Sequence, residues 1–298
     1  MTSQSTSRVN PWITGARLRT LPAAVSPVIV GTGAAAAVGS AVLSRAALAL
    51  VVALSLQVGV NYANDYSDGV RGTDDSRVGP LRLVASGAAT PRSVLTAAWL
   101  AFLVAALAGI ALVVLSQQWW LLGVGALAIV AAWYYTGGSR PYGYRGLGEV
   151  SVFVFFGLVA VVGTTYVQVG RVTASSVISG IAIGCLACAI LLANNLRDAP
   201  TDAATGKRTL AVFLGSRRTR ILYLLLVATA YALALALTFG GRAWSWLALL
   251  SAPLAVKASL PIVQRARGVD LIPVLRDTGL TQLAYAALLA IGLALTAP

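Results

Sequence analysis

The sequence predicts an all-α integral membrane protein with nine transmembrane helices. Of its 298 residues, 58% are hydrophobic and 10% are charged, whereas soluble domains carry about 25% charged residues. Apolar segments long enough to cross a bilayer recur along the chain, and basic residues gather in every second break between them. We therefore expect a single transmembrane domain over residues 1–298, in which residues 1–10 form a short polar tail.

Each expected helix is an apolar run of about 18–23 residues that ends at polar, glycine or proline residues. The first run follows a polar and basic stretch, and its length indicates a retained helix rather than a cleaved signal. The sixth run contains Cys185 and Cys188, which we interpret as packing residues because no second cysteine pair completes a metal site. Pro200 is expected to end this helix. The runs lie at 21–43, 46–64, 93–115, 119–136, 148–168, 176–197, 221–239, 244–262 and 278–297.

The breaks between the runs alternate between short, nearly uncharged ones and long, charged ones. Only Arg45, Arg171 and Arg242 lie on the side of the short breaks, and the other 19 of the 22 basic residues lie on the opposite side. Because positive residues stay on the cytoplasmic side of a membrane, we expect the N-terminus and the long loops inside and the C-terminus outside. The net charge of +13 then reflects membrane orientation and an anionic ligand, not nucleic acid.

The nine acidic residues lie on the side of the long breaks, and most of them form two clusters. The clusters are N-Y-A-N-D-Y-S-D-G-V-R-G-T-D-D at 61–75 and N-N-L-R-D-A-P-T-D-A-A-T-G-K-R-T at 194–209. Both begin Asn-x-x-x-Asp after an apolar run, and the spacing of 133 residues suggests an internal duplication. Isolated charges such as Asp270 are explained by solvated loops or helix caps, but two such clusters are not.

Oxygen-rich side chains in this pattern predict a magnesium–diphosphate site. Mg²⁺ binds few protein carboxylates and keeps waters and substrate phosphates as ligands. The chain has no histidine, which excludes histidine bases and histidine-bound metals. On a helix, residues spaced by four and seven share a face. This spacing makes Asn61, Asp65, Asp68, Asn194 and Asp198 candidate ligands, with Asp74 and Asp202 reaching in from loops.

A diphosphate also requires cations, and an allylic substrate benefits from aromatic rings. Arg71, Arg140, Lys207 and Arg208 are the candidate diphosphate-binding residues, because arginine suits bidentate contacts with phosphate. Each of them also fits a simple anchor on the positive side of a membrane. Aromatic faces stabilise cations, although such residues also form belts at membrane interfaces. The candidates for lining an apolar channel or stabilising a carbocation are Trp133, Tyr134, Tyr135, Phe153 and Phe156.

These motifs resemble those of the UbiA-type intramembrane prenyltransferases over nearly the whole chain. The resemblance implies a nine-helix bundle around a central cavity, two Asp-rich motifs at the cytoplasmic side, Mg²⁺ and a polyprenyl diphosphate. Asn64, Asp65 and Asp68 match the N-D-x-x-D core of the first family motif, and Asp198 and Asp202 match the D-x-x-x-D of the second. Asp65, Asp68, Asp198 and Asp202 are thereby the expected catalytic residues, with Asn64 as a further metal ligand. The family's first motif commonly ends with Asp where this chain has Gly72, and Asp74 follows two residues later.

Within the family, the chain is similar to the branch that prenylates 1,4-dihydroxy-2-naphthoate in menaquinone biosynthesis. This implies loss of the acceptor's carboxylate as CO₂ on the way to demethylmenaquinone, in the cytoplasmic membrane of a bacterium, with membrane lipid around the protein. Arg17 or Arg19 is then expected to hold the carboxylate. The residues that carry the resemblance are G-A-R-L-R-T-L-P at 15–22, the motif at 61–75, R-V-G-P-L-R-L-V-A-S-G at 77–87, Y-T-G-G-S-R-P-Y-G-Y-R-G-L-G-E at 135–149 and N-N-L-R-D-A-P-T-D-A-A-T-G-K-R-T-L-A at 194–211.

Two groups of alternatives stay open at the level of sequence. Other family members use 4-hydroxybenzoate, homogentisate, haem or a sugar phosphate as the acceptor. A secondary transporter also has many membrane helices, a repeat and intramembrane polar residues such as Gln57 and Lys257. Transporter sites lie near the middle of the membrane, whereas the acidic residues here gather at one side, which favours an enzyme.

Overall fold

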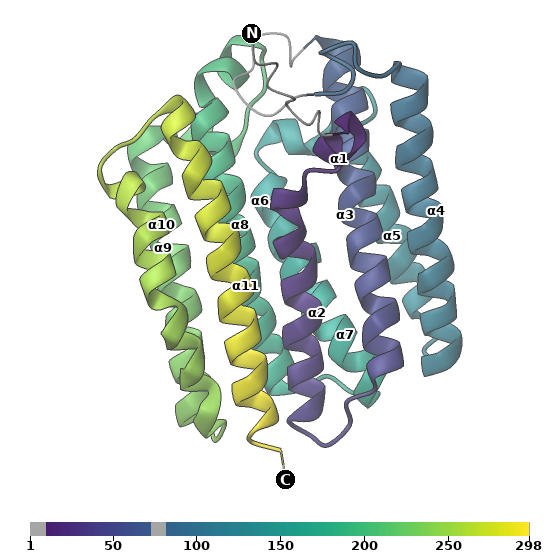
Figure 1. Cartoon of the computed structure of the whole chain (residues 1–298), viewed down its shortest axis with the longest axis vertical. Coiled ribbons are helices and arrows are strands. Elements are labelled where there is room, and N and C mark those ends of the chain that lie inside the picture. Colours follow the sequence, from purple (N-terminus) through teal and green to yellow (C-terminus); the bar gives the residue numbers. More distant parts are fainter. Residues whose placement is uncertain (1–9, 73–81, 298) are drawn as a thin grey trace, which may run out of the picture.

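The helices stand side by side in one bundle (Figure 1). The structure is a computed structural model that describes residues 10–72 and 82–297. Helices α8 to α11 lie on one side of the view, α3 to α5 lie on the other, and α2 stands between them. The elements are α1 Pro11–Gly15, the 3₁₀ turn η1 Leu18–Thr20, α2 Leu21–Ala36, α3 Leu43–Arg71, α4 Pro91–Ser116, α5 Leu121–Tyr134, the 3₁₀ turn η2 Tyr142–Arg145, α6 Gly148–Val152, the π-helix η3 Phe153–Val159, α7 Ala160–Val169, α8 Ala174–Ala204, α9 Leu210–Phe239, the 3₁₀ segment η4 Ala243–Ser251, α10 Ala252–Val263, the 3₁₀ turn η5 Gly268–Leu271 and α11 Ile272–Ala294.

Seven helical segments in the described part of the chain are long and apolar enough to cross a membrane, which makes this an integral membrane protein. The other two runs expected from the sequence correspond to α2 and α5, which have 16 and 14 residues. A spanning helix needs about 20 residues. The seven segments are Leu43–Arg71, Pro91–Ser116, Gly148–Val169, Ala174–Ala204, Leu210–Phe239, Ala243–Val263 and Gly268–Ala294.

Helix α3 runs seven residues beyond the expected end at residue 64, so Asp65 and Asp68 lie on the helix and not in a loop. Gly72 ends it with a φ of 71°, and its N–H binds the carbonyl of Asp68. A residue with positive φ just after a helix is usually glycine, because glycine has no Cβ. The positive φ therefore explains the glycine at position 72 of this chain.

Helix α8 passes through Pro200, so the expectation that this proline ends the helix is wrong. A proline inside a helix removes one hydrogen bond and crowds the preceding turn. Here Pro200 has no N–H to donate to the carbonyl four residues earlier, and the hydroxyl of the next residue, Thr201, donates to the Asp198 carbonyl at 2.8 Å. Because the helix continues to Ala204, Asp202 lies one turn beyond Asp198 on the same helix.

A π-helix, η3, joins α6 and α7 within one span, at the position where Gly157 meets α8. A Cβ on Gly157 would lie 2.6 Å from the Cα of Gly184 and 2.7 Å from the carbonyl oxygen of Gly180. Small residues let membrane helices approach this closely. The π-helix, which is frequent at functional sites, is therefore held against the helix that carries the second Asp motif.

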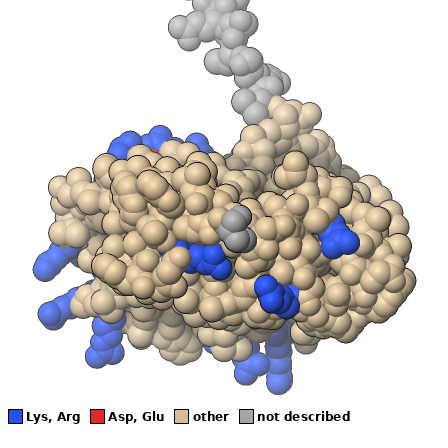
Figure 2. All heavy atoms as spheres, turned by 90° about the horizontal axis from the view of Figure 1, so that it is seen from below, with Lys and Arg blue, Asp and Glu red and all other residues tan. Residues whose placement is uncertain are grey.

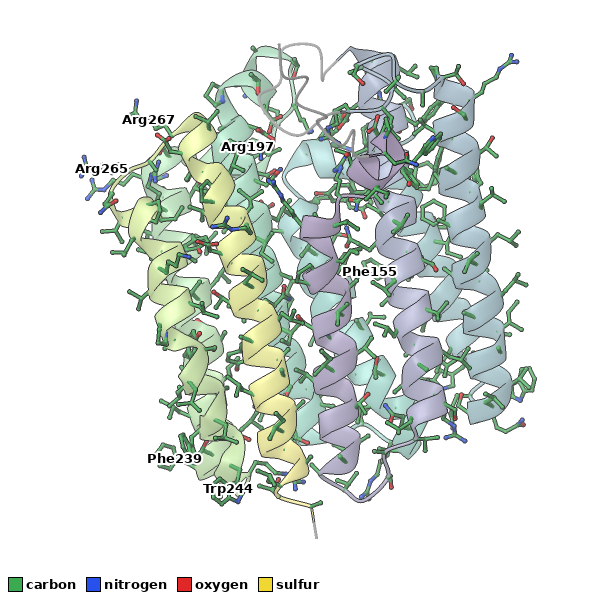
Figure 3. All side chains as sticks on the ribbon, viewed as in Figure 1. Phe155, Arg197, Phe239, Trp244, Arg265 and Arg267 are labelled. Carbon is green, nitrogen blue, oxygen red and sulfur yellow. The ribbon has the colours of Figure 1, made fainter. Side chains whose placement is uncertain are left out.

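The two ends of the bundle differ in chemistry. Arg197, Arg265 and Arg267 lie toward one end, and Phe239 and Trp244 lie at the other (Figure 3). Seen from the end at which α11 finishes, the surface is mostly uncharged, with separate Lys or Arg groups (Figure 2). The end that carries Arg197 is called the charged end below.

The contact between η3 and α8 gives a test of the packing. Gly157→Ala places a methyl group against backbone atoms that cannot rotate away, so we expect a loss of about 1–3 kcal/mol, the usual penalty for overpacking. The control is Gly163→Ala in the same span, where a Cβ would have no atom within 4 Å. Thermal unfolding in detergent should show a lower Tm for Gly157→Ala alone, and equal Tm values for both variants would contradict this packing.

Candidate functional site

Four aspartates of the two motifs are buried at the charged end of the bundle. Asp65 and Asp68 lie on α3, and Asp198 and Asp202 lie on α8. Their exposed fractions are between 0% and 8%. A buried carboxylate is strongly destabilising unless hydrogen-bond donors or cations compensate its charge. The groups that hold these four side chains therefore define the site.

Backbone amides hold Asp65. Its Oδ2 accepts from the N–H of Leu83 at 2.9 Å, and its Oδ1 accepts from the N–H of Val84 at 3.0 Å. These bonds attach the segment after the first motif to α3.

Tyr144 connects the first motif with the second. Its hydroxyl donates to Asp68 Oδ1. The guanidinium of Arg71 lies 5.6 Å from the centre of its ring, and the ammonium of Lys207 lies 4.6 Å from that centre. Lys207 also lies 3.8 Å from Asp202. One tyrosine on η2 thus brings cations and carboxylates of both motifs together.

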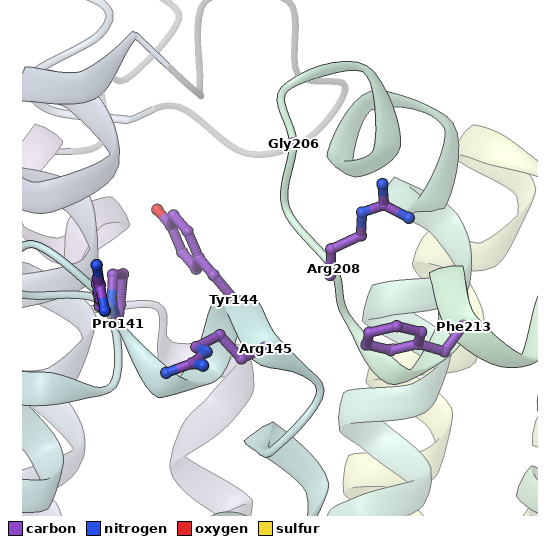
Figure 4. Close-up of a pocket in the computed structure, with 7 residues that line it drawn as sticks. Pro141, Tyr144, Arg145, Gly206, Arg208 and Phe213 are labelled. Carbon is purple, nitrogen blue, oxygen red and sulfur yellow. The ribbon is translucent and has the colours of Figure 1, made fainter.

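An arginine-rich cavity of about 490 Å³ opens beside Tyr144. Arg140, Arg145 and Arg208 line it (Figure 4). The N–H of Arg208 donates to the Tyr144 carbonyl at 2.9 Å, which fixes the loop after α8 against η2. Guanidinium groups form paired, charge-assisted hydrogen bonds with phosphate oxygens, so this cavity suits a diphosphate. Pro141, Gly206 and Phe213 complete the lining.

Arg197 holds the start of the second motif. Its Nε and Nη2 bind the two oxygens of Asp198 at 2.6 and 2.7 Å, and its Nη2 also donates to Asn194 Oδ1 at 2.9 Å. Both members of the Arg197–Asp198 pair are buried. The bidentate geometry makes this a strong charge-assisted contact.

The asparagines of the first motif contact other segments. The Asn61 amide donates to the Ala16 carbonyl at 2.9 Å and to Thr20 Oγ1 at 3.0 Å, and Gln57 donates to its oxygen at 3.2 Å. Asn61 thereby attaches the N-terminal segment to α3. Asp74 lies outside the described residues.

Asn64 and Arg71 both contact the loop that follows α5. Asn64 Oδ1 accepts from Thr136 Oγ1 at 2.7 Å. Arg71 donates to the carbonyls of Thr136 and Gly138. This loop therefore lies against the end of α3, beside the first Asp motif.

The two candidate arginines of the N-terminal segment differ in their surroundings. Arg17 is half-buried with a positive φ of 54°, and it donates to the Asn61 carbonyl at 3.4 Å. Arg19 is exposed. Arg17 is therefore the one that the structure ties to the first motif.

The candidate aromatic residues have different environments. Trp133 stacks on Trp99 of α4 with ring centres 5.0 Å apart, and Tyr134 is 52% exposed. Tyr135 meets Tyr142 edge to face at 5.6 Å. Phe153 and Phe156 are half-buried on η3, where the Phe153 ring faces Gly184 of α8. Trp133 of α5 thus packs against α4.

The donor chemistry fits magnesium. The site offers carboxylate and amide oxygens, which Mg²⁺ prefers. Within the described residues, no three Asp, Glu, His or Cys side chains form a group that can hold a metal alone.

Sequence reasoning missed the individual roles of Tyr144, Arg145 and Arg197. All three lie within the motifs, but a tyrosine or arginine there looks like a membrane anchor. A buried Asp without an oppositely charged neighbour is rare, so the adjacent Arg197-Asp198 pair was the available signal. Nothing in the sequence indicated that Tyr144 would contact both motifs.

Known proteins share extensive sequence similarity with this chain. Residues 24–271 match the UbiA prenyltransferase family. A 1,4-dihydroxy-2-naphthoate octaprenyltransferase from Mycobacterium tuberculosis is 56% identical, covering 95% of this chain and 96% of the relative. The enzyme of that name from Escherichia coli is 40% identical, covering 93% of each chain.

The fold has solved relatives. A UbiA homolog from Archaeoglobus fulgidus bound to GPP and Mg²⁺ superposes with a TM-score of 0.68 at 14% identity, covering 95% of this chain and 99% of the other. An apo UbiA homolog from Aeropyrum pernix superposes with a TM-score of 0.66 at 16% identity, covering 91% and 96%. At this identity the likeness concerns the fold alone. From the match to the family model and the extensive identity to its members, this chain belongs to the UbiA prenyltransferase family.

Proposed function

We propose that this protein transfers a polyprenyl group from polyprenyl diphosphate to 1,4-dihydroxy-2-naphthoate, with loss of CO₂, in menaquinone biosynthesis. The observation that carries the proposal is identity of 56% and 40%, over nearly complete chains, to relatives named for that activity. The site supports it, because Tyr144 joins the two Asp motifs beside a cavity lined by three arginines.

The reaction begins with departure of the diphosphate. The bond between the allylic carbon and the diphosphate oxygen breaks, and its electron pair goes to the leaving group. Arg140, Arg145 and Arg208 stabilise the charge that develops there. Magnesium, when bound, neutralises further charge on the diphosphate, and Asn64, Asp65, Asp68, Asp198 and Asp202 are the residues proposed to hold it, supported by Asn61 and Asn194.

The acceptor then forms the new carbon–carbon bond. The electron-rich ring attacks the allylic carbon, and release of CO₂ returns an electron pair to the ring, so that no oxidant is needed. The apolar bundle keeps water away from the allylic cation. Arg17, which lies beside Asn61, and Arg19 are proposed to hold the acceptor's carboxylate.

The proposed arrangement in the membrane has nine helices in one domain around a central cavity. The seven long spans and the two shorter helices α2 and α5 make up the nine. The charged end faces the bacterial cytoplasm and the C-terminus lies outside, because basic residues are retained inside. Lys257, a residue type that would suit a transporter, pairs with Asp277 at 3.5 Å. That pair joins α10 to α11, not the helices α3 and α8 that carry the Asp motifs.

A metal-binding role for the motifs predicts a severe loss of turnover. Asp68→Asn and Asp202→Asn should each lower kcat at least about a hundredfold, as expected when an electrostatic contact to the transition state is lost. Asp270→Asn is the control, because Asp270 is an exposed acid outside both motifs. EDTA should abolish product formation by the parent protein, and added Mg²⁺ should restore it. Full activity in EDTA would contradict the role of metal.

The proposed orientation is tested by labelling in intact cells. Thr205 and Ala297 are exposed, at opposite ends of the bundle, whereas the native Cys185 and Cys188 are buried. A cysteine introduced by Thr205→Cys should resist a membrane-impermeant thiol reagent, and one introduced by Ala297→Cys should react. The parent protein serves as the unlabelled control. The reverse pattern would place the site outside the cytoplasm.

The acceptor is tested with purified protein, Mg²⁺ and a polyprenyl diphosphate. Mass spectrometry should find a prenylated naphthoquinol that lacks the carboxylate, and 4-hydroxybenzoate should react far more slowly. Arg19→Ala should raise KM for the naphthoate more than for the prenyl diphosphate. Arg171→Ala, at an exposed site on the opposite end, should change neither. A product that retains its carboxylate would refute the assignment.

A further inference from the structure

Glu149 is a buried carboxylate that lies outside both Asp motifs. It is 7% exposed, at the start of α6. Its Oε1 accepts from the Asn195 amide of α8 at 2.9 Å. Its Oε2 is buried and has no hydrogen-bond partner among the described residues. Buried polar atoms in native proteins are rarely left without a partner, so this oxygen points to a donor supplied by a ligand.

The position of Glu149 along the bundle indicates which ligand that is. Its partner Asn195 precedes Asp198 by three residues and Asp202 by seven on α8. At 1.5 Å per residue, Asn195 lies about 4.5 Å and about 10.5 Å deeper in the bundle than these two aspartates. A diphosphate held at the Asp motifs would direct its prenyl carbon toward this depth. The acceptor ring must meet the allylic carbon there.

Tyr135 packs against the start of α6, beside Glu149. Its hydroxyl is 3.1 Å from the place where a Cβ on Gly148 would lie. Burial, followed by the carboxylate of Glu149 and more weakly those of Asp68 and Asp202, raises the pKa of Tyr135, so the phenol stays neutral.

We propose that Glu149 Oε2 accepts a hydrogen bond from a ring hydroxyl of the aromatic acceptor and thereby selects a dihydroxylated ring. This inference rests on the proposed function, and it names a substrate-binding residue that the Asp motifs do not include. A pocket that leaves a buried polar atom unpaired rejects an analogue lacking the matching hydroxyl much more strongly than an apolar pocket does. Asn195 holds the carboxylate from the other side and so orients the free oxygen.

The experiment compares the diol with analogues that each lack one hydroxyl. KM is measured for 1,4-dihydroxy-2-naphthoate, and inhibition constants are measured for 1-hydroxy-2-naphthoate and 4-hydroxy-2-naphthoate, which reports binding without chemistry. The parent protein should favour the diol over one of the analogues at least about tenfold, the range expected when a buried hydrogen-bond acceptor loses its partner. The ratio to follow is the inhibition constant of that analogue divided by the KM of the diol. Glu149→Gln should reduce this ratio to about twofold or less, while KM for the prenyl diphosphate stays within about twofold of the parent value.

Two further variants complete the test. Asp270→Asn should keep the ratio of the parent protein, and Glu149→Asp, which retains a carboxylate, should keep part of it. A ratio unchanged in Glu149→Gln overturns the inference, as does an equal loss of affinity for the diol and both analogues. Should Glu149→Gln fail to fold, the parent protein and Glu149→Asp decide. Equal affinity of the parent protein for all three acceptors, or an unchanged ratio in Glu149→Asp, overturns the inference, and a reduced ratio in Glu149→Asp supports it. Absence of any product from the parent protein with the naphthoate would instead refute the proposed function.

Discussion

Four buried carboxylates at one end of an apolar bundle constrain the structure around them. Two backbone amides hold Asp65, the Tyr144 hydroxyl holds Asp68, and Arg197 holds Asp198. Without such groups, burial of the charges would be strongly unfavourable. The donors come from segments far apart in the chain, so satisfying the carboxylates also fixes the loops that cover the site.

The site is layered along the bundle because the residues of each layer come from successive helical turns. The carboxylates of the Asp motifs and the arginine-lined cavity form the outer layer. One turn deeper, Asn61 on α3 and Asn195 on α8 hold polar groups on two sides of the bundle. Below them the helices are mostly apolar, although Gln57 extends the polar layer by one turn on α3. A substrate with a charged head, a polar acceptor beside its first carbon and a hydrocarbon tail fits this order, since burial of each CH₂ contributes about 0.8 kcal/mol.

Close backbone contacts give this arrangement its rigidity. The π-helix η3 packs on Gly180 and Gly184 of α8 through Gly157. Just before η3, Glu149 of α6 bonds with Asn195, and Cys188 donates to the Glu149 carbonyl at 3.1 Å. The end of α6 that bears Glu149 is thus attached to the helix that bears the second Asp motif. Side chains held on helices keep a more exact geometry than side chains on loops.

The sequence by itself determined the membrane class, the approximate positions of the helices and the gathering of acidic residues at one side. These properties follow from apolar run length and charge alternation, which are local. It also marked Asp65, Asp68 and Asp198, because their spacing places them on helical faces, whereas Asp202 was expected in a loop and was marked by the resemblance to the family's second motif. The ends of α3 and α8 were misjudged, since Gly72 and not the first charge ends α3, and the last turns of α8 tolerate Pro200.

Only the tertiary structure decided which residues act together. Tyr144 contacts groups from both motifs, and Arg145 joins Arg140 and Arg208 around one cavity. Glu149 accepts a hydrogen bond from Asn195, which lies 46 residues later in the chain. Such contacts have no local pattern, because they arise where buried charges from distant helices must find partners in the same small volume.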